Sequence, residues 1–459
     1  DAELDMDNDI SKSFLEVISK GVSSRKTGQP VRFVFDNAIS REMLEYLVKQ
    51  LNLDQDNNLI PGGRYHNFKD FMSFPNIGSS YLVYKKEAPL PHPLIKYHKS
   101  IIDTMAQRDF MLHVPYQDFN IFIRLLQEAS IDPRVTEISL TVYRVAKNSK
   151  VINALINAAR NGKRVYVVIE LQARFDEETN IYYSRKLEEV GARVSFGFPG
   201  LKIHAKLLNI VRKEGSKLVN YSCVSTGNFH EGNARVYSDL FLFTADKRIT
   251  SEVKRVFDFF ENSYKNFTSR HLIKSPLYLR RKMYQLIERE IKNAKAGKEA
   301  YIILKLNSLV DPDVIHKLYK ANDAGVKIKM IVRGICSLKP GVPGLSENVE
   351  AVSIVDKFLE HSRVLIFCNN GNEQYYITSA DWMSRNLDRR VEIACPIYDK
   401  TVQQEIRALI DLQLKDNVKA RIINAVQDNE YVPSDGLRKI RSQVEIYEYY
   451  QDLLRKENY

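Results

Sequence analysis

The sequence contains two copies of a strand–helix–strand unit, and this repeat constrains the fold more than any other feature. In the first copy, residues 137–143 (EISLTVY) and 164–171 (RVYVVIEL) are strand-like apolar runs on either side of a segment with helical spacing. In the second copy, residues 300–306 and 326–332 repeat this plan, and NGKRVYVVIE aligns with AGVKIKMIVR without a gap. Each unit implies a right-handed crossover and a parallel sheet core. The fold class is therefore predicted to be α/β, with two similar halves.

The helix inside each copy is marked by residues that favour helix starts. Asn148 or Ser149 can cap the first helix, and Asp311 followed by Pro312 can start the second. Outside the repeat, residues 30–36 alternate like a strand and residues 41–51 have helical spacing, so the first part of the chain is predicted to be α+β. From about residue 435 the sequence is typical of a charged amphipathic helix packed along one face.

A histidine with a basic residue two positions later follows each unit. These pairs are His204 with Lys206 and His361 with Arg363, and each is followed by a further strand and a small polar turn. Side chains two positions apart on a strand point to the same face. A neutral imidazole is a competent nucleophile, and its reaction with a phosphoryl group gives a phosphoramidate. We therefore predict one shared site in which His204 accepts phosphate, Lys206 neutralises its oxygens and His361 acts as an acid/base or holds the transferring group.

Arginines stand at the ends of the predicted parallel strands. Arg144 and Arg174 follow the two strands of the first half, and Arg333 follows the matching second strand of the repeat. Ligands of open α/β sheets bind at the carboxyl ends of the strands. Guanidinium groups there can bind phosphate oxygens in pairs and offset charge that develops during phosphoryl transfer.

Composition narrows the partners without choosing one. The net charge of +11 favours a polyanion, such as a nucleic acid, an anionic lipid, a nucleotide or a chain of phosphates. The sequence has no GxxxxGK[ST] or GxGxxG loop, and no zinc-finger or RNA-recognition signature. Its four cysteines are widely separated and lack metal-binding spacing. No apolar run reaches the roughly 18 residues that a membrane-spanning helix needs.

A duplicated α/β half with one His-x-Lys-like motif each resembles the phospholipase D superfamily. Hydrolases of that superfamily carry an Asp after four further residues, where this chain has Val211 and Cys368, and Arg363 stands where they have Lys. These departures argue against a phosphodiesterase. A more specific resemblance is to polyphosphate kinases of the long, histidine-phosphorylating class. It rests on TVYRVAKNSKVINALINAARNGKRVYVVIELQARFDEE, KIHAKLLNI, STGNFHEGNARVYSD, IVRGICSLKPGVPGLSENV, FLEHSRVLIF and SADWMSRNLDRRVE, and it covers the chain from about residue 90.

This resemblance implies a domain organisation. Two tandem phospholipase D-like α/β domains, residues 91–271 and 272–459, are expected to form one shared active site. Residues 1–90 resemble the end of the family's head domain. Because the family's amino-terminal domain has no counterpart and the sequence opens at Asp1, we expect the chain to be a fragment.

The resemblance also implies an activity, namely reversible transfer of the ATP γ-phosphate to inorganic polyphosphate through phospho-His204. Tyr237, Arg333 and His361 match positions that the family associates with ATP. Mg²⁺ is the implied cofactor, ATP/ADP and polyphosphate are the implied substrates, and a homo-oligomer without nucleic acid is expected. The implied location is cytoplasmic, with membrane contact that is at most peripheral.

Two further positions, Arg144 and Arg174, match the family's magnesium-bound phosphate site. Arginine is permanently cationic, so we interpret both as phosphate clamps rather than metal ligands. Two alternatives stay open at this point. One is a phosphodiesterase or nuclease of the phospholipase D type, and the other is a non-catalytic polyanion-binding module that kept the fold.

Overall fold

The structure, a computed structural model, describes residues 32–51, 53, 59–65, 71, 74–171, 177–198, 201–262, 268–434 and 436–457. The chain divides into two compact units, Asp1–Glu87 and Ala88–Tyr459. In the smaller unit, β1 (Phe33–Asp36) pairs in parallel with β2 (Leu59–Gly62). Helix α2 (Arg41–Gln50) begins after Ser40, whose hydroxyl accepts a hydrogen bond from the Met43 N–H, and η2 (Ser80–Leu82) is a short 3-10 turn. The predicted strand and helix of this region are confirmed.

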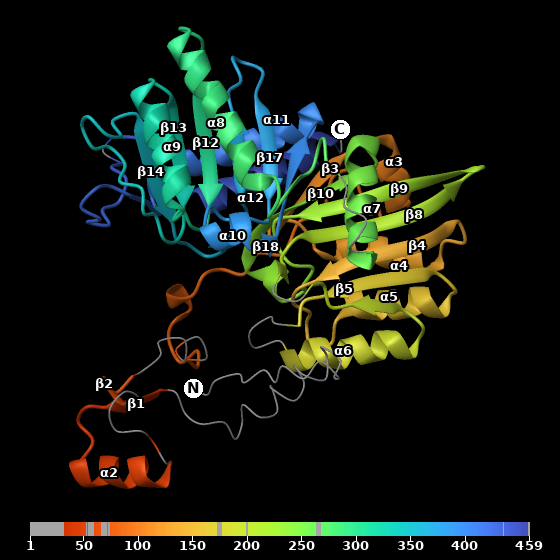
Figure 1. Cartoon of the computed structure of the whole chain (residues 1–459), viewed down its shortest axis with the longest axis horizontal. Coiled ribbons are helices and arrows are strands. Elements are labelled where there is room, and N and C mark those ends of the chain that lie inside the picture. Colours follow the sequence, from red (N-terminus) through yellow and green to blue (C-terminus); the bar gives the residue numbers. More distant parts are fainter. Residues whose placement is uncertain are drawn as a thin grey trace. The chain divides into compact units, whose positions relative to one another are not determined.

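The first half of the larger unit is built on a mixed sheet. Its strands lie in the order β15-β10-β9-β8-β4-β5-β6, with β3 paired to β10 (Figure 1). The strands β4, β5 and β6 are parallel, as the repeat predicts. The strands are β3 (Phe110–Val114), β4 (Val135–Val142), β5 (Arg164–Ile169), β6 (Arg193–Ser195), β8 (Lys206–Glu214), β9 (Lys217–Ser225), β10 (Tyr237–Thr244) and β15 (Leu359–Glu360). The helices are α3 (Ile101–Gln107), α4 (Asn120–Ile131), α5 (Lys150–Arg160), α6 (Glu177–Glu189) and α7 (Lys247–Glu261), with a 3-10 turn η3 (Asn233–Arg235).

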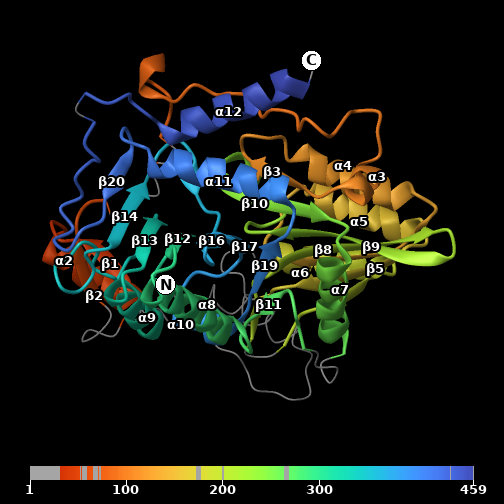
Figure 2. The same ribbon diagram turned by 90° about the horizontal axis from the view of Figure 1, so that it is seen from above.

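The second half repeats this plan with the strand order β11-β19-β17-β16-β12-β13-β14-β20. Helices α8 and α9 cover one face of the sheet, and α11 and α12 lie on the other (Figures 1 and 2). The strands are β11 (Ile273–Lys274), β12 (Tyr301–Leu306), β13 (Lys327–Val332), β14 (Val349–Ile354), β16 (Val364–Phe367), β17 (Gln374–Thr378), β19 (Ile393–Ile397) and β20 (Ala420–Ile422). The helices are α8 (Leu279–Lys295), α9 (Pro312–Asp323), α10 (Ser384–Asp388), α11 (Lys400–Leu414) and α12 (Ser442–Glu457). The predicted α/β class with two tandem halves is confirmed.

Local sequence signals fix the starts of the repeated helices. The Ser149 hydroxyl accepts a hydrogen bond from the Ile152 N–H at the start of α5, and Asp311 accepts one from the Val314 N–H at the start of α9. The C-terminal helix, expected from about residue 435, begins only at Ser442. Before it, the backbone of Ile440 is bonded to Asn417, whose N–H donates to the Ile440 carbonyl and whose side-chain oxygen accepts the Ile440 N–H. This contact with a distant residue holds Ile440 outside the helix.

A hydrophobic core lies between the two halves and contains residues of both. Alternate residues of β12 point to opposite faces of its sheet, as in any strand. Ile302 and Leu304 face a core with α8 and α9, whereas Ile303 belongs to a second core. That second core also contains Ile203 and Leu207 of the first half. The halves are therefore packed sheet against sheet around a common apolar interior.

Short strand pairs cross between the halves. Strand β7 (Lys202–Ile203) of the first half pairs in parallel with β18 (Arg390–Val391) of the second. In the reverse sense, β15 of the second half pairs in parallel with β10 of the first. Each predicted histidine motif follows one of these crossing strands directly. Within the described residues, we find no helix whose length and apolar content would suit a membrane crossing.

Candidate active site

The backbone at His204 is anchored by the other half of the molecule. The N–H groups of His204 and Ala205 both donate to the Val391 carbonyl, each at 2.9 Å. The His204 side chain is 13% exposed, and its Nδ1 lies 2.9 Å from Oε2 of the fully buried Glu392. A carboxylate at Nδ1 fixes the tautomer with the proton on Nδ1. The lone pair of Nε2 is then available for a ligand.

Glu392 is itself held in place by a neighbouring turn. The Ser379 hydroxyl donates to Oε2 at 2.5 Å, and the Ile393 N–H donates to the Ser379 hydroxyl at 3.1 Å. Burial raises the pKa of Glu392 to about 7, although the positive charge of Lys206 and the Ser379 hydrogen bond act in the opposite direction. The carboxyl group therefore changes its charge near neutral pH.

The second histidine has the equivalent arrangement, with the roles of the two halves exchanged. The N–H groups of His361 and Ser362 donate to the Ser238 carbonyl at 3.2 and 2.8 Å. Nδ1 of His361 lies 2.9 and 2.8 Å from the two carboxylate oxygens of Asp239. Burial alone would raise the pKa of Asp239, but the adjacent His361 ring and the Thr226 hydroxyl hold it below its ordinary value. Asp239 is therefore an anion at neutral pH and accepts the Nδ1 proton.

Two buried cations lie with the histidines. Nζ of Lys206, 2% exposed, donates to the His204 carbonyl and lies 5.5 Å from the centroid of the Tyr143 ring. Burial lowers the pKa of Lys206 to about 7, and Glu392 opposes this shift. Arg363 pairs with Asp381 at 3.0 Å, and its NH1 lies 3.3 Å from Nε2 of His361. After burial, the charges of Lys206 and Arg363 are among the causes that lower the pKa of both histidines. One electrostatic environment therefore includes both motifs.

The residue that directly follows the second strand of each repeat anchors the segment before the histidine. In the first half this residue is Glu170, whose Oε2 accepts the Ile203 N–H at 2.8 Å. In the second half it is Arg333, whose Nε donates to the Glu360 carbonyl at 2.8 Å and to Asn307 at 3.2 Å. The aligned positions thus have the same structural role with opposite charge.

The other predicted site residues are distributed around this centre. The Tyr237 ring centroid lies 5.0 Å from that of His361. The guanidinium carbon of Arg144 lies 5.8 Å from the Tyr143 ring, which in turn meets the His204 ring edge-on at 5.1 Å. Arg174 lies outside the described residues.

Sequence reasoning did not find the carboxylates. It looked for an Asp at residues 211 and 368, where the structure has buried Val211 and Cys368. Asp239, in β10, and Glu392, between β18 and β19, come instead from the opposite half, so neither histidine lacks a carboxylate. A signal was present, because each acid stands 13 positions after a hydroxyl residue of a small polar turn, Asp239 after Thr226 and Glu392 after Ser379.

The donor set does not suit a metal held by the protein. Among the residues that the structure describes, no group of three or more His, Cys, Asp or Glu side chains could hold a metal ion. Arg144 and Arg174 cannot ligate Mg²⁺, because a guanidinium carries no free lone pair at neutral pH.

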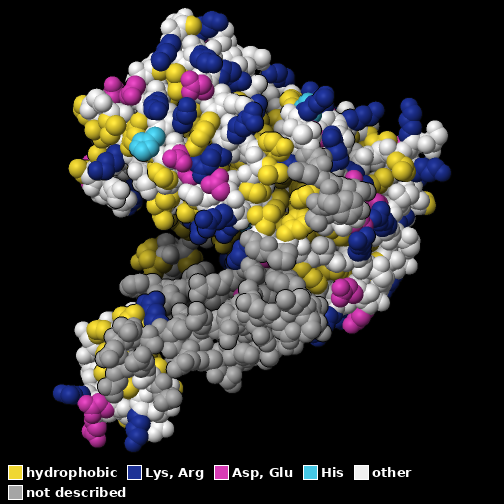
Figure 3. All heavy atoms as spheres, viewed as in Figure 1, with side chains coloured by type: hydrophobic (Ala, Val, Ile, Leu, Met, Phe, Trp, Pro, Cys, Tyr) yellow, Lys and Arg dark blue, Asp and Glu magenta, His cyan; other side chains and the backbone are white. Residues whose placement is uncertain are grey.

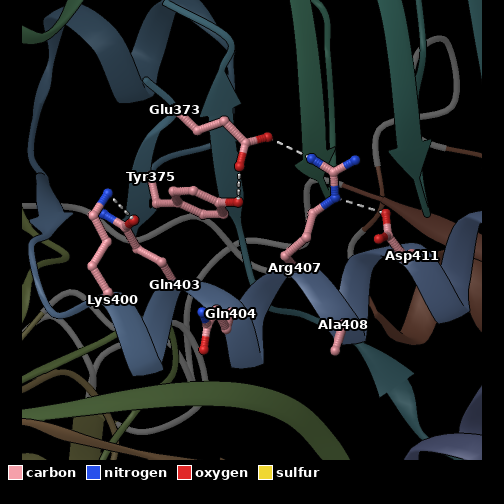
Figure 4. Close-up of a pocket in the computed structure, with 8 residues that line it drawn as sticks. All are labelled: Glu373, Tyr375, Lys400, Gln403, Gln404, Arg407, Ala408 and Asp411. Atoms are coloured by element: carbon pink, nitrogen blue, oxygen red, sulfur yellow. Dashed lines mark hydrogen bonds and ion pairs between the residues drawn. The ribbon is translucent and has the colours of Figure 1, made fainter. Parts of the chain in front are cut away.

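A separate open pocket lies between β17 and α11 (Figure 4). Arg407 there pairs with Glu373 at 2.5 Å and with Asp411 at 2.9 Å, and Lys400 donates to Gln403 at 2.9 Å. The excess of Lys and Arg over Asp and Glu is not concentrated at this pocket either. On the face shown in Figure 3, Lys and Arg side chains are dispersed with Asp and Glu among them. The paired histidines therefore remain the candidate active site.

Fold and site together define a class of duplicated α/β proteins in which two His-centred motifs complete each other across the seam between the halves. Comparison with known proteins identifies the family. Residues 1–74 match the polyphosphate kinase middle domain, residues 100–266 its C-terminal domain 1 and residues 272–443 its C-terminal domain 2. The chain belongs to the polyphosphate kinase family.

Individual relatives agree with this assignment. The chain is 49% identical to the polyphosphate kinase of Vibrio cholerae over 453 residues, which are 99% of this chain and 65% of that protein. It is 46% identical to that of Escherichia coli K12 over 461 residues, covering 100% of this chain and 67% of that protein. The crystal structure of polyphosphate kinase from Porphyromonas gingivalis matches with a TM-score of 0.84 and 39% identity, covering 93% of this chain and 65% of that one. The chain thus spans about two thirds of the length of the relatives it matches.

Proposed function

We propose that this chain contains the phosphotransfer centre of an ATP:polyphosphate phosphotransferase that works through phospho-His204. The observation that carries the proposal is the 2.9 Å contact between Nδ1 of His204 and the buried Glu392, which directs the reactive lone pair to Nε2. Membership of the polyphosphate kinase family supports the choice of ATP and polyphosphate as substrates.

The first step is attack on ATP. The Nε2 lone pair forms a bond to the γ-phosphorus while the bond from that phosphorus to the β–γ bridging oxygen breaks, and ADP leaves with the bonding electrons. Nδ1 keeps its proton, so the phosphorylated ring is cationic and faces Glu392. In the second step a terminal oxygen of polyphosphate attacks the phosphorus, the P–N bond breaks and the ring returns to its neutral form. The reverse sequence makes ATP from polyphosphate.

The surrounding cations stabilise the charge of the transferring group. Lys206 and Arg363 are both buried, and electrostatic interactions are stronger there than in water. His361 is held by Asp239 and faces the same centre as an acid/base or a ligand for the transferring group. We assign Tyr237 and Arg333 to the nucleotide.

The remaining arginines, Arg144 and Arg174, are proposed as phosphate clamps. Mg²⁺ fits this scheme as part of the substrate, bound to the oxygens of the nucleotide phosphates rather than to a protein ligand set. The proposal also includes a homo-oligomeric enzyme in the cytoplasm, with membrane contact that is at most peripheral.

The test is labelling with γ-³²P-ATP and Mg²⁺. We expect an acid-labile, base-stable phosphate on a peptide that contains His204, and no such label in His204→Ala. His316→Ala on the exposed side of α9 is the matched control and should label like the parent chain. Label that persists in His204→Ala would show that this assignment is wrong. Release of products from a phosphodiester substrate would favour a hydrolase, and polyphosphate binding without ATP turnover would favour a binding module.

A further inference from the structure

The C-terminal helix α12 packs next to α11 (Figure 2). Its residues Gln443, Ile446 and Tyr450 are spaced by three and four positions, share one face and are buried. The start of the helix is fixed, because the backbone N–H and the hydroxyl of Ser442 both donate to Asp416, at 2.7 and 2.6 Å. The helix therefore places the buried side chains of Gln443 and Tyr450 at defined positions.

Gln443 binds the segment that leads to His361. Its Nε2 donates to the Phe358 carbonyl at 2.9 Å, and its Oε1 accepts the Phe358 N–H at 2.8 Å. One side-chain amide thus satisfies both backbone groups of Phe358, as a neighbouring strand would do. Nε2 also donates to Oε1 of Glu360 at 2.8 Å. The amide is connected to the chain on both sides of Leu359.

Glu360 is a buried charge immediately before His361. Its Oε2 accepts hydrogen bonds from Nζ of Lys305 at 2.5 Å and from Nε2 of Gln413 at 2.7 Å. The matching position of the first half is the buried, apolar Ile203. A buried ion pair costs desolvation and often adds no net stability compared with apolar side chains, so its use here favours a geometric role. Donors from β12, α11 and α12 together fix the position of β15.

Tyr450 acts on the partner strand of β15. Its hydroxyl donates to Oε1 of Glu405 at 3.0 Å and lies 3.2 Å from Nδ1 of His113. Nε2 of His113 lies 2.8 Å from the Ser238 hydroxyl. Ser238 stands between Tyr237 and Asp239, and its carbonyl accepts the N–H groups of His361 and the next residue. The hydrogen-bonded chain from α12 therefore ends at the residue that holds both members of the His361–Asp239 pair.

We propose that α12 is a positioning element of the phosphotransfer centre. Gln443 sets the position of β15 and hence of His361, and Tyr450 sets the position of β10 through His113 and hence of Asp239. The proposal deepens the proposed function and rests on it only where it concerns the rate of phosphoryl transfer. The geometric part concerns the His361–Asp239 pair itself.

The test uses the full chain and three variants of α12. Gln443→Leu removes the amide, and Tyr450→Phe removes one hydroxyl. Tyr447→Phe is the matched control, since the Tyr447 hydroxyl donates to the Ala88 carbonyl at 3.0 Å, away from both catalytic strands. The imidazole nitrogens of His361 are followed by NMR after selective ¹⁵N-histidine labelling. We expect Gln443→Leu and Tyr450→Phe, but not Tyr447→Phe, to shift the His361 signals.

The kinetic readout is the rate constant of phosphohistidine formation at saturating ATP. Gln443→Leu removes three hydrogen bonds, one of them to Glu360, and Tyr450→Phe removes the two contacts of its hydroxyl. Because these groups act through the position of β15 and β10, we expect a decrease of roughly three- to tenfold, the equivalent of about one hydrogen bond, for each variant. Unchanged His361 signals in both variants, or shifted signals with an unchanged rate constant, would overturn the proposal. If the unsubstituted chain is never phosphorylated, the proposed function fails, while the NMR comparison still decides the geometric part. If Gln443→Leu does not fold, Tyr450→Phe carries the test.

Discussion

Replacement of Glu392 by Gln tests the proposed role of the carboxylate most directly. Gln keeps the size of the side chain and removes only its charge. In the native site, the carboxylate accepts the Ser379 hydroxyl at 2.5 Å and lies 2.9 Å from Nδ1 of His204. A neutral amide oxygen accepts the Nδ1 proton more weakly and stabilises the cationic phosphoimidazole less. It can also rotate and present its NH₂ group to Nδ1, which favours the unreactive tautomer.

The size of the effect follows from the hydrogen bond that is weakened. Hydrogen bonds to charged groups contribute about 1.5–3 kcal/mol. At about 1.36 kcal/mol per factor of ten, this corresponds to a decrease of roughly 10- to 150-fold in the rate constant of phosphohistidine formation. The effect should appear in the rate constant at saturating ATP, because the charge develops after the nucleotide is bound.

The assay is a single-turnover measurement with γ-³²P-ATP and rapid quenching into base, which preserves the P–N bond. The matched control is Glu290→Gln. Glu290 lies in α8, is also fully buried and accepts a hydrogen bond from the Asn369 N–H at 2.9 Å. The control should form phosphohistidine at the parent rate. A Glu392→Gln chain that is folded and reacts as fast as the parent would refute the role of the carboxylate.

Three further predictions concern pH, steric fit and stability. Burial raises the pKa of Glu392 to about 7 and lowers that of Lys206 to about 7, so the carboxylate is protonated below neutral pH and the ammonium loses its proton above it. Phosphohistidine formation should therefore be fastest near pH 7 and slower on both sides, and Glu392→Gln should lack the decline on the acid side. Gly227→Ala would place a Cβ 2.0 Å from Oδ2 of Asp239, so we expect slower labelling with native circular dichroism, and an unchanged rate would contradict the crowding. Arg212→Met removes the cation that contacts its carboxylate partners at 2.6–2.8 Å. Because some of these carboxylates are partly exposed, we expect the free energy of unfolding, measured in urea, to fall by about 2 kcal/mol. An unchanged free energy of unfolding would show that the cluster does not contribute to stability.

The fold was predictable where its signals are local. The apolar periods of β4, β5, β12 and β13 and the caps Ser149 and Asp311 lie within the elements that they specify. The start of α12 was not, because it depends on Asp416 and Asn417, which are distant in the sequence and bonded to Ser442 and Ile440. Contacts of that kind leave no periodic pattern.

The site was predictable to the same extent. His204 and Lys206 stand two positions apart, and their repetition as His361 and Arg363 marked them without any knowledge of the fold. The carboxylates escaped detection because their relation to the histidines passes through the pairing of β7 with β18 and of β10 with β15, which joins residues more than a hundred positions apart. Only the equal spacing of Asp239 and Glu392 from their small polar turns was available in the sequence.

The crossed pairing of strands and carboxylates has a consequence for the origin of this architecture. A solitary ancestral half would have carried a histidine without its backbone anchor and without its acid. The simplest ancestor with a complete site is therefore a symmetric pair of identical subunits, each lending its strand to the other. With both halves in one chain, matching positions need not be identical, and here Lys206 corresponds to Arg363 and Ile203 to Glu360. A single chain can therefore hold its two histidines in unequal surroundings, one beside Glu392 and the other beside Asp239.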